Sequence, residues 1–280
     1  MSLFCQKYRK ISMRRLIHFY SFLAIFSLTS ILFIASTPPE NTYRSLRQDS
    51  FQAGEKYHYK IKLSFIPVGE ADVSVHPSIF SVNNRPCYRI NVLGRTTGIS
   101  DYFKVRNTYR SFVDTAAILP HRFVFSARER EYKKDQVLDF DHRRHQVIST
   151  EKLEENTFQV PAQVHDLISG YYYLRTLDYK KLANGQIISS PVFFDGELYN
   201  MRVKYAGKGE VKTRFGKIKV IKLTPILPPN KLFDGENGIR VWVSDDKNRV
   251  PVKLEVDFKI GGASMELDEY SGNKHAFNWM

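Results

Sequence analysis

Most of the chain alternates apolar and polar residues with a period of two. In 57–65, aromatic and aliphatic residues at odd positions alternate with histidine, lysine and serine at even positions. Similar runs occur at 71–75, 88–93, 109–113, 122–127, 136–140, 145–149, 201–205, 211–214, 218–223, 239–243, 252–260 and 263–270. Such alternation is typical of antiparallel strands that bury one face and hydrate the other. We therefore predict a mainly β protein built on a curved antiparallel sheet or an open half-barrel.

One segment, 162–182, has a helical period instead. Its apolar residues recur at steps of three and four: Val164, Leu167, Ile168, Tyr171, Leu174 and Leu177. Asn184 and Gly185 then favour a stop. The pattern predicts one amphipathic helix that packs on the sheet, or plugs it, through a buried stripe containing Leu167.

The strongest local signal is the apolar segment 16–36, which holds no acidic or basic residue and follows Arg14 and Arg15. As a helix it would be roughly 31 Å long, about the thickness of a bilayer core. The flanking charge predicts that the chain after Ser36 is exported. Residues 1–36 are then either a cleaved signal peptide or an uncleaved signal anchor, through which the protein would contact the membrane.

The rest of the chain divides into a tether, one domain and a tail. Residues 37–50 are polar and begin with consecutive prolines after Thr37, which predicts a tether. Residues 51–272 hold the alternating runs and are expected to form a single β domain. Residues 273–280 follow the last run and are expected to form a short tail.

The β domain carries a repeated pattern. Phe-x-x-Gly-Glu-x-Tyr occurs at 51–57 and again at 193–199. Later in each half an aspartate precedes a proline by six residues, as Asp114 does Pro120 and Asp245 does Pro251. We predict two similar meanders, 51–160 and 190–272, in which Gly-Glu opens the first strand and the Asp–Pro segment is a turn. Chance repetition of short turn motifs is the alternative.

Charge and cysteine content narrow the function classes. The net charge is +13, of which five charges lie in residues 1–36, so 37–280 carries +8. The basic residues alternate with apolar ones, which is typical of a solvated strand face, so we expect no nucleic-acid partner. Attraction to an anionic membrane surface is the more favoured role for this charge. Only Cys87 follows the leader, which predicts a buried, inert thiol and no internal disulfide.

The sequence contains no recognisable catalytic constellation. The motifs HExxH, GxSxG and GxxxxGK[ST] are absent. His142 and His145 would diverge in a solvated hairpin turn, and His165-Asp166 is better explained by an acid capping a helix. We therefore assign no catalytic residue, no metal ligand and no cofactor, and expect a protein that is not an enzyme.

The predicted helix offers the best candidate binding site. Its candidate ligand-binding residues are Leu167, Tyr171, Tyr172, Leu174 and Arg175. A helix in the concavity of a half-barrel would present tyrosine rings inward, and Arg175 could meet an anionic head group. The alternative is that Tyr171 and Leu174 simply belong to the core.

Several ordered motifs resemble one family. The runs FQAGEKYHYKIKL, VGEADVSV, DYFKVRNTYRSFVDTAAILPHRF, HDLISGYYYLR and VWVSDDKNRVPVKLEV are similar to the bacterial domain of unknown function 3108, over about 51–272. The resemblance implies an exported envelope protein of Gram-negative bacteria with no established biochemical activity, for which no catalytic residues are defined. The closing strands are also similar in architecture to lipoprotein carriers, in which an open β half-barrel cups acyl chains under a helix, although fold alone does not fix function.

Three functions are compatible with these features. The first is a periplasmic binding module for a lipidic or amphipathic ligand, which requires an apolar cavity beneath 162–182. The second is a structural or assembly partner that docks another envelope protein or an anionic membrane surface. The third is a hydrolase of envelope polymers, which requires acidic or histidine side chains that meet in a cleft.

Overall fold

The computed structural model describes residues 43–226, 238–259 and 261–280. Residues 43–280 belong to one compact unit. The segment 16–36 and the first part of the tether lie outside the described residues. None of the helices in the described ranges has the length and apolar character needed to cross a membrane.

The described chain contains fourteen strands, one α-helix and two short 3₁₀ helices. The strands are β1 (Lys56–Leu63), β2 (Ile66–Val82), β3 (Arg85–Thr96), β4 (Arg106–Asp114), β5 (Pro120–Glu129), β6 (Tyr132–Asp141), β7 (Gln146–Glu151), β8 (Glu154–Gln159), β9 (Ile187–Phe194), β10 (Glu197–Thr213), β11 (Gly216–Ile226), β12 (Ile239–Ser244), β13 (Pro251–Asp257) and β14 (Gly262–Ser271). The helices are η1 (Gly98–Phe103), α2 (Leu167–Arg175) and η2 (Tyr179–Lys181).

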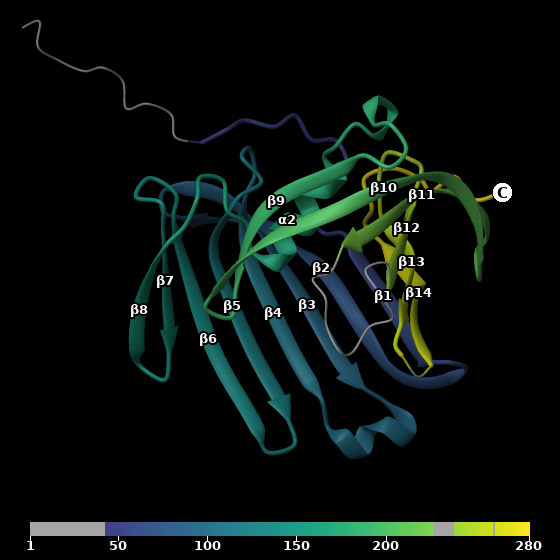
Figure 1. Ribbon diagram of the computed structural model, residues 1–280, viewed down its shortest axis with the longest axis horizontal. Helices are drawn as coiled ribbons and strands as arrows, with labels where there is room; N and C mark the ends of the chain where they lie inside the picture. Colours follow the sequence, from purple (N-terminus) through teal and green to yellow (C-terminus); the bar gives the residue numbers. More distant parts are fainter. Residues whose placement is uncertain (1–42, 227–237, 260) are drawn as a thin grey trace, which may run out of the picture. The chain divides into compact units, whose positions relative to one another are not determined.

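All fourteen strands form one antiparallel sheet, as Figure 1 shows, which confirms the predicted fold class. Its order is β8-β7-β6-β5-β4-β3-β2-β1-β14-β13-β12-β11-β10-β9. Strands β1–β8 and β9–β14 are two meanders, and pairing of β1 with β14 joins them. Within the described part of the chain no ladder joins β8 to β9, so the sheet stays open.

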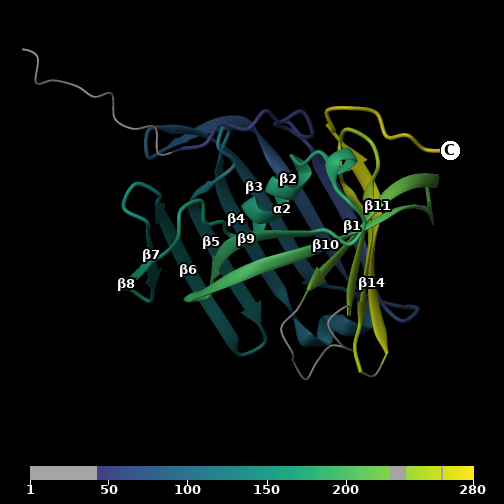
Figure 2. The ribbon, with the colours of Figure 1, turned by 45° about the horizontal axis from the view of Figure 1, so that its top comes forward.

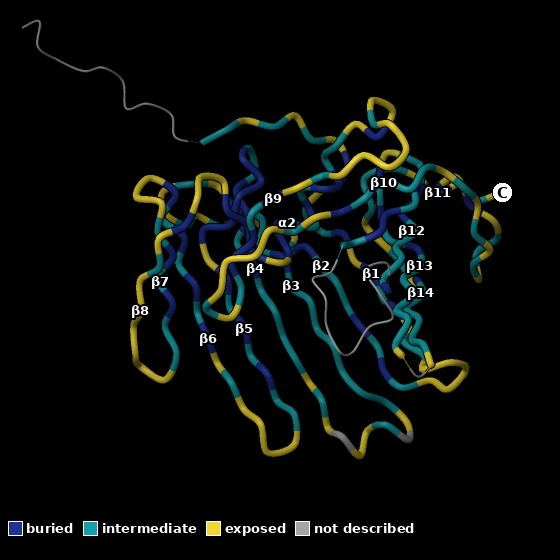
Figure 3. The backbone as a smooth tube through the Cα atoms, in the orientation of Figure 1, coloured by how far each residue is buried: buried dark blue, intermediate teal, exposed yellow. Residues whose placement is uncertain are grey.

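The sheet curls so that β9 lies over the concave face of the first meander, with α2 beside it (Figure 2). The Phe193 ring packs 5.1 Å from that of Phe158 on β8, and Phe194 packs 6.3 Å from Phe123 on β5. Buried positions gather around α2, whereas the hairpin tips at the far ends of the strands are exposed (Figure 3). The core therefore sits between α2 and the concave face.

The helix is shorter than the predicted 162–182. It begins after Asp166, whose carboxylate accepts a hydrogen bond from Ser169 N at 2.6 Å, while Ser169 Oγ accepts one from Asp166 N at 3.0 Å. This capping box satisfies two free N–H groups at the helix start. The prediction failed upstream because the extended backbone of His165 pairs with β9, donating to Pro191 O and accepting from Phe193 N. The predicted role of Asp166 as a cap is confirmed.

The buried stripe also differs from the prediction at Leu167. Ile168 is only 6% exposed and contributes to the core, whereas Leu167 is 45% exposed. Leu167 is the first residue of α2, and its side chain lies at the cavities beside the helix and is not packed in the core. Its placement on a buried stripe was therefore wrong.

A buried ion pair fixes α2 to the sheet. Arg175, the last residue of α2, donates from Nη1 to Glu55 Oε1 at 2.5 Å and from Nη2 to Glu55 Oε2 at 3.1 Å. Both side chains are at most 1% exposed. Arg175 Nε also donates to Asn248 O at 3.0 Å, and the hydroxyls of Tyr57 and Tyr172 donate to the Glu55 carboxylate. The pair thus connects the start of β1, the end of α2 and the turn between β12 and β13.

The two Gly-Glu-x-Tyr motifs occupy different places in the topology. Glu55 directly precedes β1, but Glu197 opens β10, which is the second strand of its meander. The prediction that Gly-Glu opens the first strand of both halves was therefore wrong for the second half. The local contact is the same, since the Tyr199 hydroxyl donates to Glu197 at 2.7 Å as the Tyr57 hydroxyl does to Glu55 at 3.0 Å.

The Asp–Pro turns do occupy equivalent places. Each joins the fourth strand of a meander to the fifth, β4 to β5 and β12 to β13. In both turns the residue two positions before the proline has a left-handed backbone, with φ of 53° at Ile118 and 52° at Arg249. This recurring turn supports the two-meander interpretation of the sheet.

The segments expected as a tether and a tail lie against the sheet where they are described. Leu46 N donates to Ala116 O at 2.8 Å, and Arg44 Nη2 lies 2.9 Å from His165 Nε2. At the other terminus, Met280 N donates to Lys217 O at 2.8 Å, and Trp279 Nε1 donates to the Tyr270 hydroxyl at 2.9 Å. Backbone hydrogen bonds hold both segments, so neither hangs free of the domain in the described ranges.

Substitutions at neighbouring helix positions test the orientation of α2. Ile168→Asp places a charge in the core and is expected to lower the free energy of unfolding by more than about 3 kcal/mol. Leu167→Asp, at a half-exposed position, is expected to lower it by less than about 1 kcal/mol. Urea denaturation measures both, and equal losses would contradict the orientation.

The two Gly-Glu-x-Tyr motifs provide a matched test of the ion pair. Glu55→Gln leaves the buried Arg175 guanidinium without a countercharge, so we expect a loss of about 3–5 kcal/mol in the free energy of unfolding. Glu197→Gln alters the same motif at an exposed position, and we expect a loss below about 0.5 kcal/mol. Denaturant titrations measure the free energy of unfolding of both variants. A small loss for Glu55→Gln would show that the ion pair is dispensable for stability.

Candidate functional site

The histidines of the 139–145 segment do not come together. His142 is buried and its Nε2 donates to Pro120 O at 2.7 Å, whereas His145 is exposed. Burial lowers the pKa of His142 to about 4. The expectation of a solvated turn was therefore wrong for His142, because its ring packs between β5, β6 and Tyr43.

His165 and Asp166 are held by contacts that maintain the fold. Arg44 Nη2 donates a hydrogen bond to His165 Nε2, so the hydrogen of the neutral ring is on Nδ1. His165 Nδ1 then donates to Ser169 Oγ at 3.1 Å. Burial lowers the pKa of His165 to about 3 and raises that of Asp166 to about 6. Asp166 accepts from Ser111 Oγ and from the first turn of α2. Both side chains are buried, and their polar atoms are engaged by these contacts within the protein.

Other chemistry-bearing residues are similarly enclosed. Cys87 is fully buried, as predicted, and burial raises the pKa of its thiol to about 12. The described residues contain no group of three or more His, Cys, Asp or Glu side chains positioned to hold a metal ion.

An apolar cavity of about 320 Å³ lies beside α2. One wall is α2 with the segment up to Tyr179, and the facing wall is formed by β1, β2 and β10–β14. Twelve of its seventeen lining residues are aliphatic, methionine or proline, three are tyrosine and two are arginine. No acid or histidine is among these described lining residues. A lining of this composition can hold hydrocarbon.

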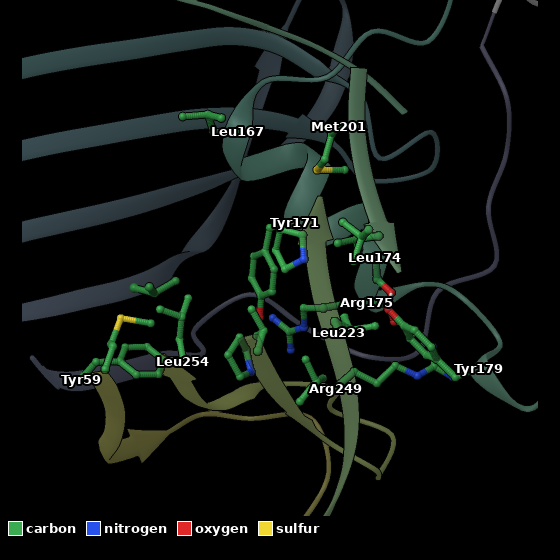
Figure 4. Close-up of a pocket in the computed structure, with 17 residues that line it drawn as sticks. Tyr59, Leu167, Tyr171, Leu174, Arg175, Tyr179, Met201, Leu223, Arg249 and Leu254 are labelled. Atoms are coloured by element: carbon green, nitrogen blue, oxygen red, sulfur yellow. Dashed lines mark hydrogen bonds between the residues drawn. The ribbon is translucent and has the colours of Figure 1, made fainter. Parts of the chain in front are cut away.

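Figure 4 shows how the lining side chains converge. Tyr171 and Leu174 extend from α2, opposite Leu254 of β13 and Tyr59 of β1. Burial raises the pKa of the Tyr171 hydroxyl further above its ordinary range, which already lies well above pH 7, so the side chain is neutral at pH 7. Four of the five candidate residues named from the sequence, Leu167, Tyr171, Leu174 and Arg175, line this cavity.

The fifth candidate, Tyr172, lines a smaller cavity of about 250 Å³, which lies next to the larger one and shares Val73, Leu167 and Tyr171 with it. This second cavity lies between α2 and strands β2, β3 and β4 of the first meander. The Tyr172 side chain is buried and its hydroxyl donates to Glu55 at 2.8 Å. Its ring therefore forms a fixed wall of that cavity.

The two arginines at the larger cavity are engaged within the protein. Arg175 is paired with Glu55, so its anionic partner is a carboxylate of the protein and not the ligand head group expected from the sequence. Arg249 Nη1 donates to Arg175 O at 2.8 Å and so caps the C-terminus of α2. The lining thus offers mainly apolar contacts to a ligand.

Sequence reasoning missed the strand residues of the facing wall. Met201, Leu223, Leu254 and Met265 belong to four strands of the second meander. Alternation places each on one face of its strand, but it does not tell which inward-facing residues leave space between them. That information depends on how far α2 lies from each strand.

Three solved structures are similar to this chain at low sequence identity. The chain is similar to a β-barrel-like protein of domain of unknown function DUF1849 from Brucella abortus, with a TM-score of 0.52, 10% identity and coverage of 81% of this chain and 99% of that chain. A putative lipoprotein from Parabacteroides distasonis matches with a TM-score of 0.32, 10% identity and coverage of 81% and 99%. A putative exported protein with a YmcC-like fold from Bacteroides fragilis matches with a TM-score of 0.31, 10% identity and coverage of 82% and 99%.

No curated protein matches the sequence. The family described as "Protein of unknown function (DUF3108)" matches residues 58–268, which span β1 to β14 and include α2 and both cavities. This range covers most of the chain and confirms the resemblance found in the motifs. The chain therefore belongs to the DUF3108 family.

Proposed function

We propose that this protein is an exported envelope protein whose larger cavity binds the hydrocarbon part of a lipidic or amphipathic ligand. The observation that carries the proposal is the apolar lining of that cavity, contributed by α2 on one side and by strands of both meanders on the other. Burial of hydrocarbon contributes roughly 25 cal/mol for each Å² removed from water, so such a cavity favours an apolar guest.

The polar groups near the cavity support the same proposal. Glu55 and Arg175 satisfy each other, and Arg249 is engaged at the end of α2. A water molecule needs two to four polar partners to be held in a cavity, and this lining provides few. A hydrocarbon chain can therefore take the place of water in this cavity without breaking a network of hydrogen bonds between water and the lining.

Export to the periplasm is supported by the sequence. The apolar segment 16–36 follows two arginines, which directs the following chain across a membrane. A retained segment would anchor the domain in the inner membrane, and a cleaved one would release it. A lipid-binding domain in either position has hydrophobic ligands within reach.

Filling the cavity tests the proposed function. Leu254→Trp adds bulk to a lining residue that lies outside the core clusters, and we expect affinity for dansyl-labelled undecanoate to fall at least about tenfold. Leu198→Trp, at a half-exposed position on β10 outside the cavity, is the control and should bind like the unmodified protein. Fluorescence titration of the full chain measures both. Absence of binding by the unmodified protein would refute the proposal.

One exposed turn favours a second candidate function, docking to an anionic membrane surface. The turn between β1 and β2 exposes Phe65 by 84%, with Leu63 and Ile66 exposed by more than 40% on either side. Lys62 lies beside them. Exposed apolar residues flanked by basic ones are typical of membrane-interface segments.

Vesicle binding tests this second candidate. Phe65→Ser is expected to reduce co-sedimentation with phosphatidylglycerol vesicles by at least about threefold, because one buried aromatic ring contributes more than 1 kcal/mol of transfer free energy. Leu153→Ser alters another highly exposed apolar residue, in the turn between β7 and β8, and should leave sedimentation unchanged. Equal effects of the two substitutions would exclude a specific docking turn.

A further inference from the structure

We propose that the ligand carries two hydrocarbon chains, one in each of the two neighbouring cavities that lie between α2 and the sheet. This inference rests on the proposed function and adds the class of ligand: a two-chain lipid rather than a single-chain amphiphile or a compact ring system.

The two cavities share part of their walls. The larger one lies between α2 and the strands of the second meander, and the smaller one lies between α2 and β2–β4. Three residues line both of them: Val73 of β2, and Leu167 and Tyr171 of α2. The two spaces are therefore neighbours on opposite sides of these side chains.

The shared side chains are arranged as a divider. Leu167 and Tyr171 are four residues apart on α2, so they lie on the same face of the helix, one turn apart. Val73 contributes the strand side of the divider. Because Leu167 is 45% exposed, the divider reaches solvent at the first turn of α2. A head group there could remain hydrated while a chain passes on each side.

The smaller cavity is as apolar as the larger one. Its seven lining residues are valines, a leucine, an isoleucine and tyrosines, with no charged side chain. The Tyr109 ring is fixed by stacking on Phe125, with centroids 4.8 Å apart, and Tyr172 is fixed by Glu55. The cavity thus suits a second hydrocarbon chain and not a polar head group.

The sizes also favour two chains. Ligand pockets typically measure about 300–1,000 Å³, and the two cavities, at about 320 and 250 Å³, lie at or below the lower end of that range. A fused-ring lipid needs one wide, undivided space. Two narrow spaces separated by side chains instead accommodate two flexible chains that join at the divider.

The decisive comparison holds the number of acyl carbons constant and varies the number of chains. Dioctanoylphosphatidylglycerol and palmitoyl-lysophosphatidylglycerol carry the same number of acyl carbons, in two chains and in one. Each is titrated below its micelle concentration against the full-length protein loaded with dansyl-labelled undecanoate. We expect the two-chain lipid to displace the probe with at least about tenfold higher affinity.

A variant that fills only the smaller cavity tests the location of the second chain. Val92→Trp adds bulk to a residue that lines the smaller cavity and not the larger one. We expect it to remove the preference for two chains while affinity for the single-chain lipid stays within about twofold of the unmodified protein. A thermal melt checks that the variant is folded. The comparison of the two lipids in the unmodified protein does not depend on this variant.

The outcomes separate this inference from the proposed function. Equal affinity of the unmodified protein for the two lipids, or an unchanged preference in folded Val92→Trp, would overturn the two-chain inference and leave the binding function intact. Failure of every lipid and of the probe to bind would overturn the proposed function itself.

Discussion

The buried pair of Glu55 and Arg175 is the interaction on which the rest of the structure depends. It ties the end of α2 to the start of β1 and, through Asn248 O, to the turn between β12 and β13, so three distant segments meet at one guanidinium. A buried charge without its partner costs several kcal/mol, which forces these segments into one arrangement. Because the two charges are paired with each other, the neighbouring cavity presents chiefly apolar contacts to a ligand.

The open sheet explains why space remains beside the helix. The two meanders are joined through β1 and β14, and in the described chain β8 and β9 are not paired with each other. The nine-residue helix α2 lies in the concavity but does not fill it. Space is left on each side of its Leu167–Tyr171 face, toward the first meander and toward the second. Cavities on both sides are thus a consequence of one short helix inside a long sheet.

Twelve of the fourteen described strands were predictable from the sequence because alternating apolar and polar residues indicate a sheet with one buried face, and the helix was predictable from its period. Strands β8 and β9 were not predicted, since neither falls in one of the alternating runs. The helix boundary was not, since the pairing of His165 with β9 involves residues more than 20 positions apart. The fate of Arg175 was hidden for the same reason, as its partner Glu55 lies 120 residues away. The motif around Glu55 gave no signal, because Glu197 has the same neighbours and is exposed. Local patterns identified four residues of the larger cavity and Tyr172 of the smaller one, but the residues of the facing strands could be identified only from the tertiary fold.

The most direct test of the central claim, that the cavity holds hydrocarbon, is native mass spectrometry of the full chain purified from a bacterial envelope without detergent. We expect a stoichiometric lipid adduct on the unmodified protein that is lost on denaturation and absent from Leu254→Trp. Solvent extraction would release the adduct and reveal its chain composition. If the unmodified protein, like the variant, showed only the mass of the polypeptide, the cavity would not hold a bound lipid.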